Sequence, residues 1–536
     1  MLLQKSAREA LGLSLTDQVV IIDEAHNLMD AIANIYSATI SLAQLQRGRA
    51  QLTMYLQKFR NRLKGKNRVY VTQIVRLLDS LIAYLQHQAS DSKVSDHVVR
   101  IDDLITGKGV DQINLFKLTR YLQESKLARK VDGYVVFEEQ NRQKQSRKLD
   151  EVDISKTSIR EAIIPVLTHI QNFLLALMNP SVEGRFFYEH TEDRKDVMLR
   201  YMLLDPTNHF RDIVEEARAV ILVGGTMSPM EDYTRHLFSY VEPAQIMTLS
   251  CGHVIPSSNL VAWPLITSND GTEFDFTFSK RNSTAMISNA GRVLLALIRN
   301  IPDGVVVFFP SYAYLNLCVN TWKGVDIADS HQAGETLWHR INTCKPVFME
   351  GHAHNLPPHS QSTNVRNQGS ETLLTSYSKA IVNSNDARGA LLLSVINGSL
   401  SEGINFSDRL GRAVIVIGMP FPNPHSAEWK AKMEYIAQKT QHAQLDSGMG
   451  TIEAEKAGKT AAQDFYENAT MRAVNQAIGR AIRHKDDYAT ILLMDRRYGT
   501  ERIQKKLPGW IKESVQKPAA LPDIADGLKE FYAGRS

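Results

Sequence analysis

Four short segments contain residue types that can act together on a nucleotide, and the first is an acidic tetrapeptide. The sequence DEAH, residues 23–26, directly follows the apolar run Val19–Ile22. At the carboxyl end of a parallel strand, side chains face the crevice where ligands bind. An Asp there can hold Mg²⁺ through water, and an adjacent Glu can orient or deprotonate the attacking water. We predict these roles for Asp23 and Glu24, with an acidic surface turn as the alternative.

A turn of small residues follows a second apolar run. Its sequence is GGTMSP, residues 224–229. Glycine permits tight turns and a close approach of the backbone to other groups. We predict that Thr226, or alternatively Ser228, hydrogen-bonds to His26, and that this contact and Gly225 couple hydrolysis to movement. Taken alone, such a turn is also ordinary loop chemistry.

A third segment has the sequence SEGINF, residues 401–406, and lies beyond the run Leu391–Leu393. Gly403 stands next to the polar residues Ser401 and Glu402, so backbone N–H groups can approach phosphates there. An ordinary strand-to-helix turn is the alternative.

The fourth segment, QAIGRAIR at residues 476–483, contains two arginines three residues apart. On a helix Arg480 and Arg483 share a face, and Gln476, four residues before Arg480, joins them. Two guanidinium groups aimed at one place suit a triphosphate on which negative charge develops during transfer. We predict that these three side chains contact the γ-phosphate; the alternative is a basic helix end with solvated arginines.

Gly458, Lys459 and Thr460 look like the end of a phosphate-binding loop, but their surroundings differ from one. Such a loop needs a Gly five residues before Gly458, a preceding strand and a position upstream of the DEAH tetrapeptide. Position 453 is Glu, and the neighbouring residues are rich in Ala, Glu and Lys. We predict a surface insertion here.

Short apolar runs bounded by polar turns must form the strands that position these segments. Such runs are typical of strands buried on both faces of a parallel sheet. They lie at Val19–Ile22, Val220–Val223, Val305–Phe309, Leu391–Leu393, Val414–Ile417 and Ile491–Met494. Helical patterns separate most of them, which predicts an α/β fold with parallel sheets.

The stretch from about residue 35 to residue 165 follows a helical pattern instead. Seven apolar residues there share one helical face: Val71, Ile74, Val75, Leu78, Leu81, Ile82 and Leu85. We predict a mostly helical insertion within the first α/β domain. Its basic segment from Lys58 to Arg68 is interpreted as a solvated helix face, with a phosphate-tracking surface as the alternative.

Composition limits the class of protein. The chain has 536 residues, of which 43% are hydrophobic and 22% charged, as expected for several globular domains. A formal net charge of +4 permits a nucleic-acid partner without requiring one. Cys251, Cys318 and Cys344 are widely spaced, which excludes a four-thiolate metal site within the chain. No apolar run is long enough to suggest a membrane span.

The four segments, in this order, resemble the iron–sulfur DEAH DNA helicases related to XPD, and among them the chromosome-loss, or sister-chromatid cohesion, subfamily. The similarity extends over nearly the whole chain. It rests on VVIIDEAHNL (19–28), INLFKLTRYLQESKLARK (113–130), AVILVGGTMSPMEDY (219–233), SCGHVIP (250–256), VVVFFPSYAYL (305–315), LLLSVINGSLSEGINFSDRLGRAVIVIGMPFPN (391–423) and AVNQAIGRAIRHKDDYATILLMDRRY (473–498).

The resemblance implies two RecA-like parallel-sheet lobes with ATP and Mg²⁺ between them and a helical arch inserted into the first. Ser401, Glu402 and Gly403 would then link the nucleotide to DNA movement. The expected divisions, in chain order, are the start of lobe one at 1–34, the arch at 35–165, the rest of lobe one at 166–256 and lobe two at 257–536.

The resemblance also implies an activity: an ATP-dependent helicase that moves 5′ to 3′ on single-stranded or forked DNA. It would be a nuclear monomer that works with replication and cohesion proteins. The family carries a phosphate-binding loop and four cysteines for an iron–sulfur cluster ahead of the DEAH, whereas 22 residues precede Asp23 here and contain neither.

We therefore expect an N-terminally truncated form with an incomplete first lobe, weak ATP binding and no cluster. A catalytically inert fragment that binds DNA or protein is the alternative. An RNA-directed helicase ranks below both, because segments such as SCGHVIP resemble the DNA-directed subfamily.

Overall fold

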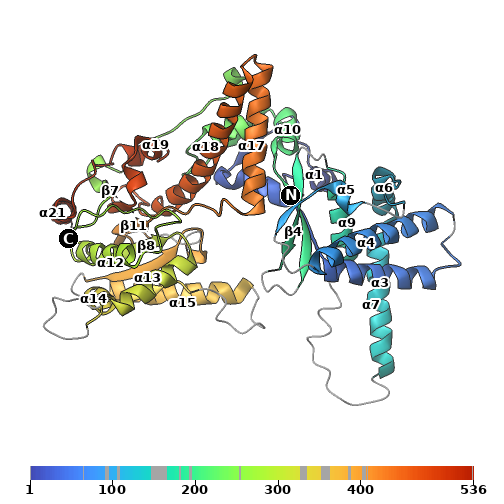
Figure 1. Ribbon diagram of the computed structural model, residues 1–536, viewed down its shortest axis with the longest axis horizontal. Helices are drawn as coiled ribbons and strands as arrows, with labels where there is room; N and C mark the ends of the chain where they lie inside the picture. The colour runs from blue at the N-terminus through green and yellow to red at the C-terminus, as the bar shows by residue number, and fades with distance from the viewer. Residues whose placement is uncertain are drawn as a thin grey trace.

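Three β-sheets organise the part of the chain that the structure describes: one of two strands, one of six and one of four. Figure 1 shows the six-stranded sheet and its helices at the left and a helical region at the right, with a tall helical hairpin between them. The computed structural model describes residues 2–63, 65–90, 96–105, 109–146, 166–179, 183–191, 196–252, 255–325, 335–351, 363–383, 388–400, 406, 408–533 and 535.

Lobe two is built on the six-stranded sheet, whose strands are all parallel. In spatial order they are β7 (Leu260–Leu265), β12 (Ala489–Met494), β11 (Ala413–Ile417), β8 (Gly304–Phe309), β10 (Ala390–Val395) and β9 (Val347–Met349). The central strands β8, β10, β11 and β12 are buried over their full lengths. This confirms the prediction that these runs form strands covered on both faces.

Alternate residues of each strand enter two different cores. Val305, Val307 and Phe309 of β8 face one core, while Val306 and Phe308 face the other. Four helices close the first core: α12 (Thr284–Ile298), α13 (Tyr312–Gly324), α14 (Leu337–Cys344) and α21 (Leu521–Tyr532). The second core is closed by α15 (Thr363–Val382), α18 (Thr451–Ile478), α19 (Glu501–Gln504) and α20 (Gly509–Lys512).

Lobe one contains, among the described residues, a sheet of two parallel strands, β1 (Val19–Ile22) and β6 (Ala219–Leu222). Its helices are α1 (Lys5–Leu11), η1 (Ala25–Asn27), α2 (Leu28–Tyr36), α10 (Thr207–Glu216) and α11 (Glu231–His236). The two runs form strands as predicted, but the prediction that both faces are buried is wrong for them. Val19 and Ile21 are 50% and 64% exposed, because no described helix covers that face of the sheet.

The insertion combines helices with an antiparallel sheet. Its strands, in spatial order, are β2 (Ala38–Ser41), β5 (Val197–Leu203), β4 (Gly184–His190) and β3 (His97–Val99). Its helices are α3 (Leu42–Lys58), α4 (Lys66–Ser90), α5 (Ile101–Leu104), α6 (Leu115–Ser125), α7 (Leu127–Ser146) and α9 (Val166–Ala176). Strands β4 and β5, which follow the boundary predicted at residue 165, pair with strands from the first half of the insertion.

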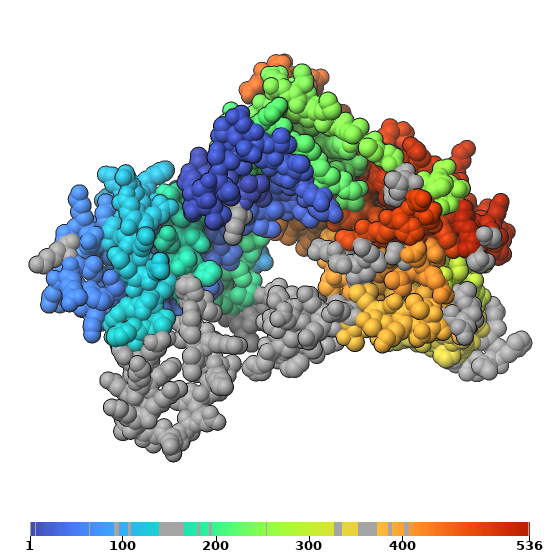
Figure 2. Space-filling model, turned by 180° about the vertical axis from the view of Figure 1, so that it is seen from behind, coloured from blue at the N-terminus to red at the C-terminus, as the bar shows by residue number. Residues whose placement is uncertain are grey.

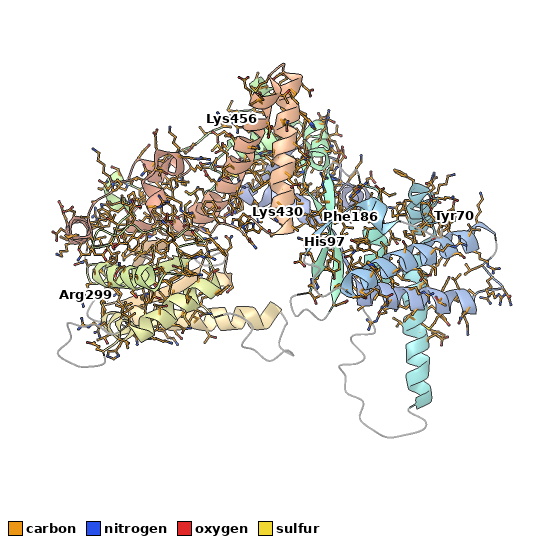
Figure 3. All side chains as sticks on the ribbon, in the orientation of Figure 1. Tyr70, His97, Phe186, Arg299, Lys430 and Lys456 are labelled. Atoms are coloured by element: carbon orange, nitrogen blue, oxygen red, sulfur yellow. The ribbon has the colours of Figure 1, made fainter. Side chains whose placement is uncertain are left out.

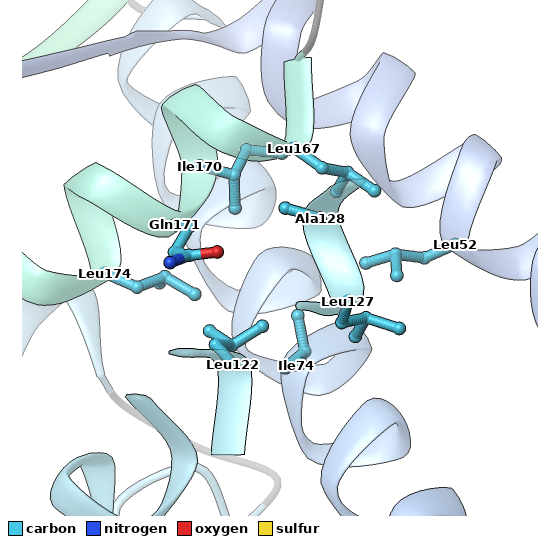
Figure 4. A pocket seen from close by; sticks show the side chains of 9 residues that line it. All are labelled: Leu52, Ile74, Leu122, Leu127, Ala128, Leu167, Ile170, Gln171 and Leu174. Atoms are coloured by element: carbon cyan, nitrogen blue, oxygen red, sulfur yellow. The ribbon is translucent and has the colours of Figure 1, made fainter. Parts of the chain in front are cut away.

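The helical pattern of the insertion is confirmed in α4, which buries Val71, Ile74, Leu78, Leu81 and Leu85. These side chains belong to one continuous core that also includes lobe-one residues. A cavity of about 10 Å³ remains within the insertion (Figure 4), and the side chains around it are apolar except for one glutamine. It has room for no more than about one water molecule, so it is a packing defect rather than a ligand site.

A long helical hairpin connects lobe two with the rest of the molecule. It consists of α17 (Ala427–Asp446) and α18, which cross closely at Gly458: a Cβ there would lie 2.5 Å from the Ala437 carbonyl oxygen. Figure 3 shows Lys430 of α17 near the sheet that carries His97 and Phe186, and α17 contacts β3 and β4.

Two polar groups fasten this hairpin to the insertion. Arg200 of β5 donates 2.9 Å to Glu428, and the Asp205 carboxylate accepts a hydrogen bond of 2.8 Å from Lys439. Viewed from behind, lobe two and the insertion lie on opposite sides of the molecule and are joined along its upper part (Figure 2). The remaining short helices are η2 (Pro243–Gln245), η3 (Ser257–Asn259), η6 (Asp408–Leu410) and η7 (Arg496–Gly499).

Candidate nucleotide site between the two lobes

The DEAH turn is fixed by the pairing of β1 with β6. Beyond the paired strands, the Val223 N–H donates to the Ile22 carbonyl and the Ala25 N–H to the Val223 carbonyl, both at 2.9 Å. Glu24 lies between them with φ of +49°, a left-handed conformation that is uncommon outside glycine. Such strain is found at functional sites, where the surrounding structure holds it. The turn presents the Asp23 and Glu24 carboxylates to solvent.

The small-residue turn lies against the DEAH turn. The Thr226 Oγ1 is 3.4 Å from the His26 Nδ1, so the hydrogen bond predicted for this pair is present. Glu24 reaches the same ring nitrogen at 3.2 Å. His26 is therefore placed between the acidic residue expected to act on water and the turn expected to sense it. Gly225 has open space around its Cα.

Lobe two meets lobe one at this turn. A methyl group on Gly479 would be 3.5 Å from the Thr226 Cγ2, and Asn475 of α18 donates 3.5 Å to the Ser228 carbonyl. The arginine-bearing segment of lobe two is thus packed directly on residues 226–228, although nearly 250 residues separate them along the chain.

The two candidate arginines lie in a turn rather than on a helix. Because α18 ends at Ile478, the prediction that Gln476, Arg480 and Arg483 share one helical face is wrong for the arginines. Gln476 is in the last helical turn, and the arginine turn, residues 479–483, begins at the capping Gly479. Hydrogen bonds from the Arg480 N–H to the Ala477 carbonyl (3.4 Å) and from the Ala481 N–H to the Ile478 carbonyl (3.2 Å) tighten the chain as it leaves the helix.

The arginine turn faces the DEAH turn across the junction. Burial and the neighbouring Arg480 lower the pKa of Arg483, and the Glu24 carboxylate opposes that shift. A carboxylate that can act on water and a guanidinium that can stabilise a phosphate thus belong to turns on the two sides of the lobe junction.

Other segments singled out in the sequence lie elsewhere. Ser401, Glu402 and Gly403 are outside the described residues. Lys459 lies in the first half of α18 and pairs with Glu455 at 2.6 Å on the exposed surface, as predicted for a surface segment rather than a phosphate-binding loop.

The basic segment of the insertion spans the end of α3 and the start of α4. Lys58 there lies 4.0 Å from Glu138.

Two acidic residues that the sequence analysis did not single out take part in this region. Asp232, which follows the small-residue turn, accepts a 2.8 Å hydrogen bond from Asn468 of α18 and pairs with Arg472. Asp487, which follows the arginine turn, is 1% exposed. A single charged residue near a motif gives little signal in a sequence, because most such residues are solvated.

An open cavity of about 990 Å³ adjoins the site on the lobe-one side. Strand β6 and the small-residue turn form one wall, the segment 245–252 another, and Pro508–Trp510 a third. Met247 and Leu249 are 94% and 76% exposed beside it. The uncovered apolar sheet face thus opens onto this cavity.

The cysteines do not suit an iron–sulfur cluster, because three thiols are fewer than the four ligands such clusters use. Within the described part of the chain, one group of three potential metal ligands occurs, Asp408, His484 and Asp487, and it contains no cysteine. No helix among the described residues is both long and apolar enough to cross a membrane.

Comparison with known proteins agrees with this fold and site. A helicase C-terminal domain family matches residues 294–514, and the family described as DEAD_2 matches residues 1–45. The solved structure of Xpd4 from S. tokodaii has a TM-score of 0.52 at 18% identity, covering 97% of this chain and 81% of that one. The fold is therefore XPD-like, and the matched C-terminal domain is one found in helicases.

Curated relatives narrow the class to a family. ATP-dependent DNA helicase chl1 of Aspergillus niger is 51% identical over 541 residues, covering 100% of this chain and 58% of that protein. ATP-dependent DNA helicase CHL1 of Coccidioides immitis is 53% identical over 536 residues, with the same two coverages. The chain belongs to the CHL1 helicase family. It spans 58% of the length of these two relatives.

Proposed function

We propose that this chain carries the hydrolytic and coupling elements of an ATP-dependent DNA helicase. The observation that carries the proposal is the packing of the end of α18 in lobe two on the small-residue turn of lobe one: Asn475 donates 3.5 Å to the Ser228 carbonyl, and the Thr226 Oγ1 of the same turn lies 3.4 Å from the His26 Nδ1. Nucleotide sites in such motors lie at this kind of junction, where one lobe acts on water and the other supplies arginines to the phosphates.

The exposed donor set suits ATP with Mg²⁺, which when bound supplies the phosphoryl group to be transferred to water. Asp23 would hold the metal through water, and Glu24 would orient the attacking water and accept its proton. Gln476, Arg480 and Arg483 would contact the γ-phosphate oxygens, where planar guanidinium groups match the developing negative charge.

Coupling to DNA would run through the contact between the two turns. The His26 Nδ1 contacts both the Glu24 carboxylate and the Thr226 hydroxyl. When Glu24 turns toward the attacking water, the contact of His26 with Thr226 would change as well. Gly225 and residues Ser401 to Gly403 would complete the link to single-stranded or forked DNA, with movement 5′ to 3′. We place the protein in the nucleus as a monomer acting with replication and cohesion proteins. The full-length relatives' names, ATP-dependent DNA helicase, support the activity.

The test is ATP hydrolysis with and without single-stranded DNA. It is run on the 536-residue chain and on a version extended by the upstream reading frame, each beside its Glu24→Gln variant. We expect DNA-stimulated hydrolysis in the extended version and a loss of about 10²- to 10⁴-fold in the variant, the range that general-base catalysis contributes.

Comparison of the 536-residue chain with the extended version distinguishes the helicase from an inert binding fragment. If it binds DNA without hydrolysing ATP while the extended version is active, the phosphate-binding loop lies outside these residues. If neither version hydrolyses ATP, the inert DNA- or protein-binding reading replaces the helicase. Hydrolysis that survives Glu24→Gln would remove Glu24 from its proposed role.

A further inference from the structure

A buried carboxylate lies directly behind the arginine turn. Asp487 is 1% exposed and stands between that turn and the first residue of β12. A buried carboxylate is costly unless hydrogen-bond donors or a cation satisfy it. Its partners therefore show what the protein uses it for.

Four donors converge on Asp487. Its Oδ1 accepts from the Arg412 Nη1 at 3.0 Å and from the Tyr488 N–H at 2.9 Å. Its Oδ2 lies 3.3 Å from the Arg483 N–H and 3.5 Å from the Asp408 N–H. One oxygen is thus fastened to the start of the central strands, and the other holds the backbone of the arginine turn and of the η6 turn.

The sheet side of this arrangement is rigid. The Arg412 guanidinium stacks over the Tyr488 ring at 3.8 Å and also donates to the Tyr488 carbonyl at 3.2 Å. The Arg412 carbonyl in turn accepts from the Tyr532 hydroxyl at 2.6 Å and from the Thr490 N–H at 2.9 Å. Asp487 therefore links the backbone of the arginine turn to residues that are fixed at the start of the parallel strands.

On the η6 side, the backbone at Asp408 is strained and a side-chain contact holds it in place. Asp408 has φ of +56°, in the left-handed region, and its carboxylate meets the His484 Nε2 at 2.9 Å. Asp408, His484 and Asp487 lie close enough to suggest a metal site. The two Asp487 oxygens already accept four hydrogen bonds, however, so the arrangement is a hydrogen-bonded scaffold.

We propose that Asp487 is a positioning residue for the arginine turn. By binding the Arg483 N–H it sets where the guanidinium groups of Arg480 and Arg483 point. Groups that act on a phosphate must be held to within about 0.5 Å by a supporting shell of hydrogen bonds. The catalytic consequence of this positioning rests on the proposed function; the positioning itself does not.

The structural part is tested by amide hydrogen exchange on Asp487→Asn. This change keeps the shape but replaces one acceptor oxygen with an NH₂ group that faces N–H donors. We expect peptides covering residues 479–486 and 408–412 to exchange at least tenfold faster. The matched control is Asp495→Asn, since Asp495 is also fully buried and paired with an arginine, Arg497, at 2.7 Å. It is expected to leave both peptides unchanged, and unchanged exchange in Asp487→Asn overturns the proposal.

The catalytic part is tested by a double-mutant cycle with Arg483→Ala in the form that hydrolyses ATP. Asp487→Asn alone is expected to lower kcat by 10- to 100-fold and to change the KM for ATP less than threefold. In a protein that already carries Arg483→Ala, adding Asp487→Asn should lower kcat by less than a further threefold, because Asp487 acts through Arg483. If Asp487→Asn lowers kcat as much in the Arg483→Ala protein as it does alone, Asp487 does not act through Arg483 and its role is merely structural. If neither the 536-residue chain nor its extended version hydrolyses ATP, the proposed function fails, and hydrogen exchange alone decides the positioning.

Discussion

Asp232 of lobe one and Arg472 of lobe two form a largely buried ion pair that joins the lobes beside the candidate site. Asp232 is 3% exposed, and the Asn468 side chain donates a 2.8 Å hydrogen bond to its Oδ1, the oxygen that is not paired with Arg472. Arg472 stands four residues before Gln476 on α18, one helical turn away. The pair therefore holds the helix that carries Gln476 against the loop that carries Thr226.

Breaking this pair should destabilise the protein. Asp232→Asn leaves the Arg472 charge buried without its counterion, and we expect a loss of about 3 kcal/mol in the free energy of unfolding. Urea denaturation measures it as a lower midpoint with an unchanged slope. Glu455→Gln, which breaks an exposed pair on the same helix, should cost no more than about 0.5 kcal/mol. Equal effects from the two variants would contradict the structural role of the pair.

The contact between Thr226 and His26 should govern how strongly DNA stimulates hydrolysis. Thr226→Val keeps the side-chain shape and removes the hydroxyl that lies 3.4 Å from the His26 Nδ1. A hydrogen bond contributes about 1 kcal/mol, so we expect the DNA stimulation of ATP hydrolysis to fall about fivefold, with hydrolysis in the absence of DNA unchanged. Ser228→Ala, which removes a nearby hydroxyl, is the control. If the DNA stimulation fell in Ser228→Ala but not in Thr226→Val, the coupling contact would involve Ser228 instead of Thr226.

Lys459 should be dispensable for hydrolysis. Its side chain is paired with Glu455 on the outside of α18 and is 75% exposed. Lys459→Ala is expected to leave the kcat and the KM for ATP within about twofold, since surface substitutions of this kind change little. Steady-state ATP hydrolysis is the measurement. Loss of activity would mean that this segment does bind phosphate and that the nucleotide site lies elsewhere.

The junction should weaken in mild acid through His236. Burial lowers the pKa of His236 to about 4, whereas an unfolded histidine titrates near 6.5. As the pH falls from 6.5 toward 4, the unfolded state takes up a proton that the folded state does not, so stability falls through this window and no further below it. At pH 5 the loss from this one group is about 2 kcal/mol.

His236→Phe should remove that part of the pH dependence while keeping the edge contact with Phe465 at 5.2 Å. Urea unfolding at pH 7 and pH 5 gives the comparison. His425→Phe, at an exposed histidine, is the control and should leave the difference between the two pH values as it is in the unmutated protein. An unchanged difference in His236→Phe would contradict the assignment.

Much of the fold follows from local patterns. The runs 305–309, 391–393, 414–417 and 491–494 form central strands, because continuous apolar runs of this length are stable only when covered on both faces. The helical periodicity of α4 is likewise visible in the sequence. The antiparallel sheet of the insertion was not predicted, because β4 and β5 pair with β2 and β3 over long sequence separations, which local patterns do not record.

The candidate site divides in the same way. Glu24, His26, Thr226 and Arg483 were identified because their motifs are short and their chemistry is specific. Asp232 and Asp487 were not, since an isolated aspartate looks the same whether it is solvated or fully buried.

The sequence by itself determined the family, the α/β class and the candidate residues for the chemistry, because these depend on residue type and short spacing. Only the tertiary structure decided that Thr226 meets His26, that the arginines lie in a turn beyond α18, and that one face of β1 and β6 is exposed. Each of these depends on residues far apart in the chain, since burial and partner choice are set by packing between elements rather than within them.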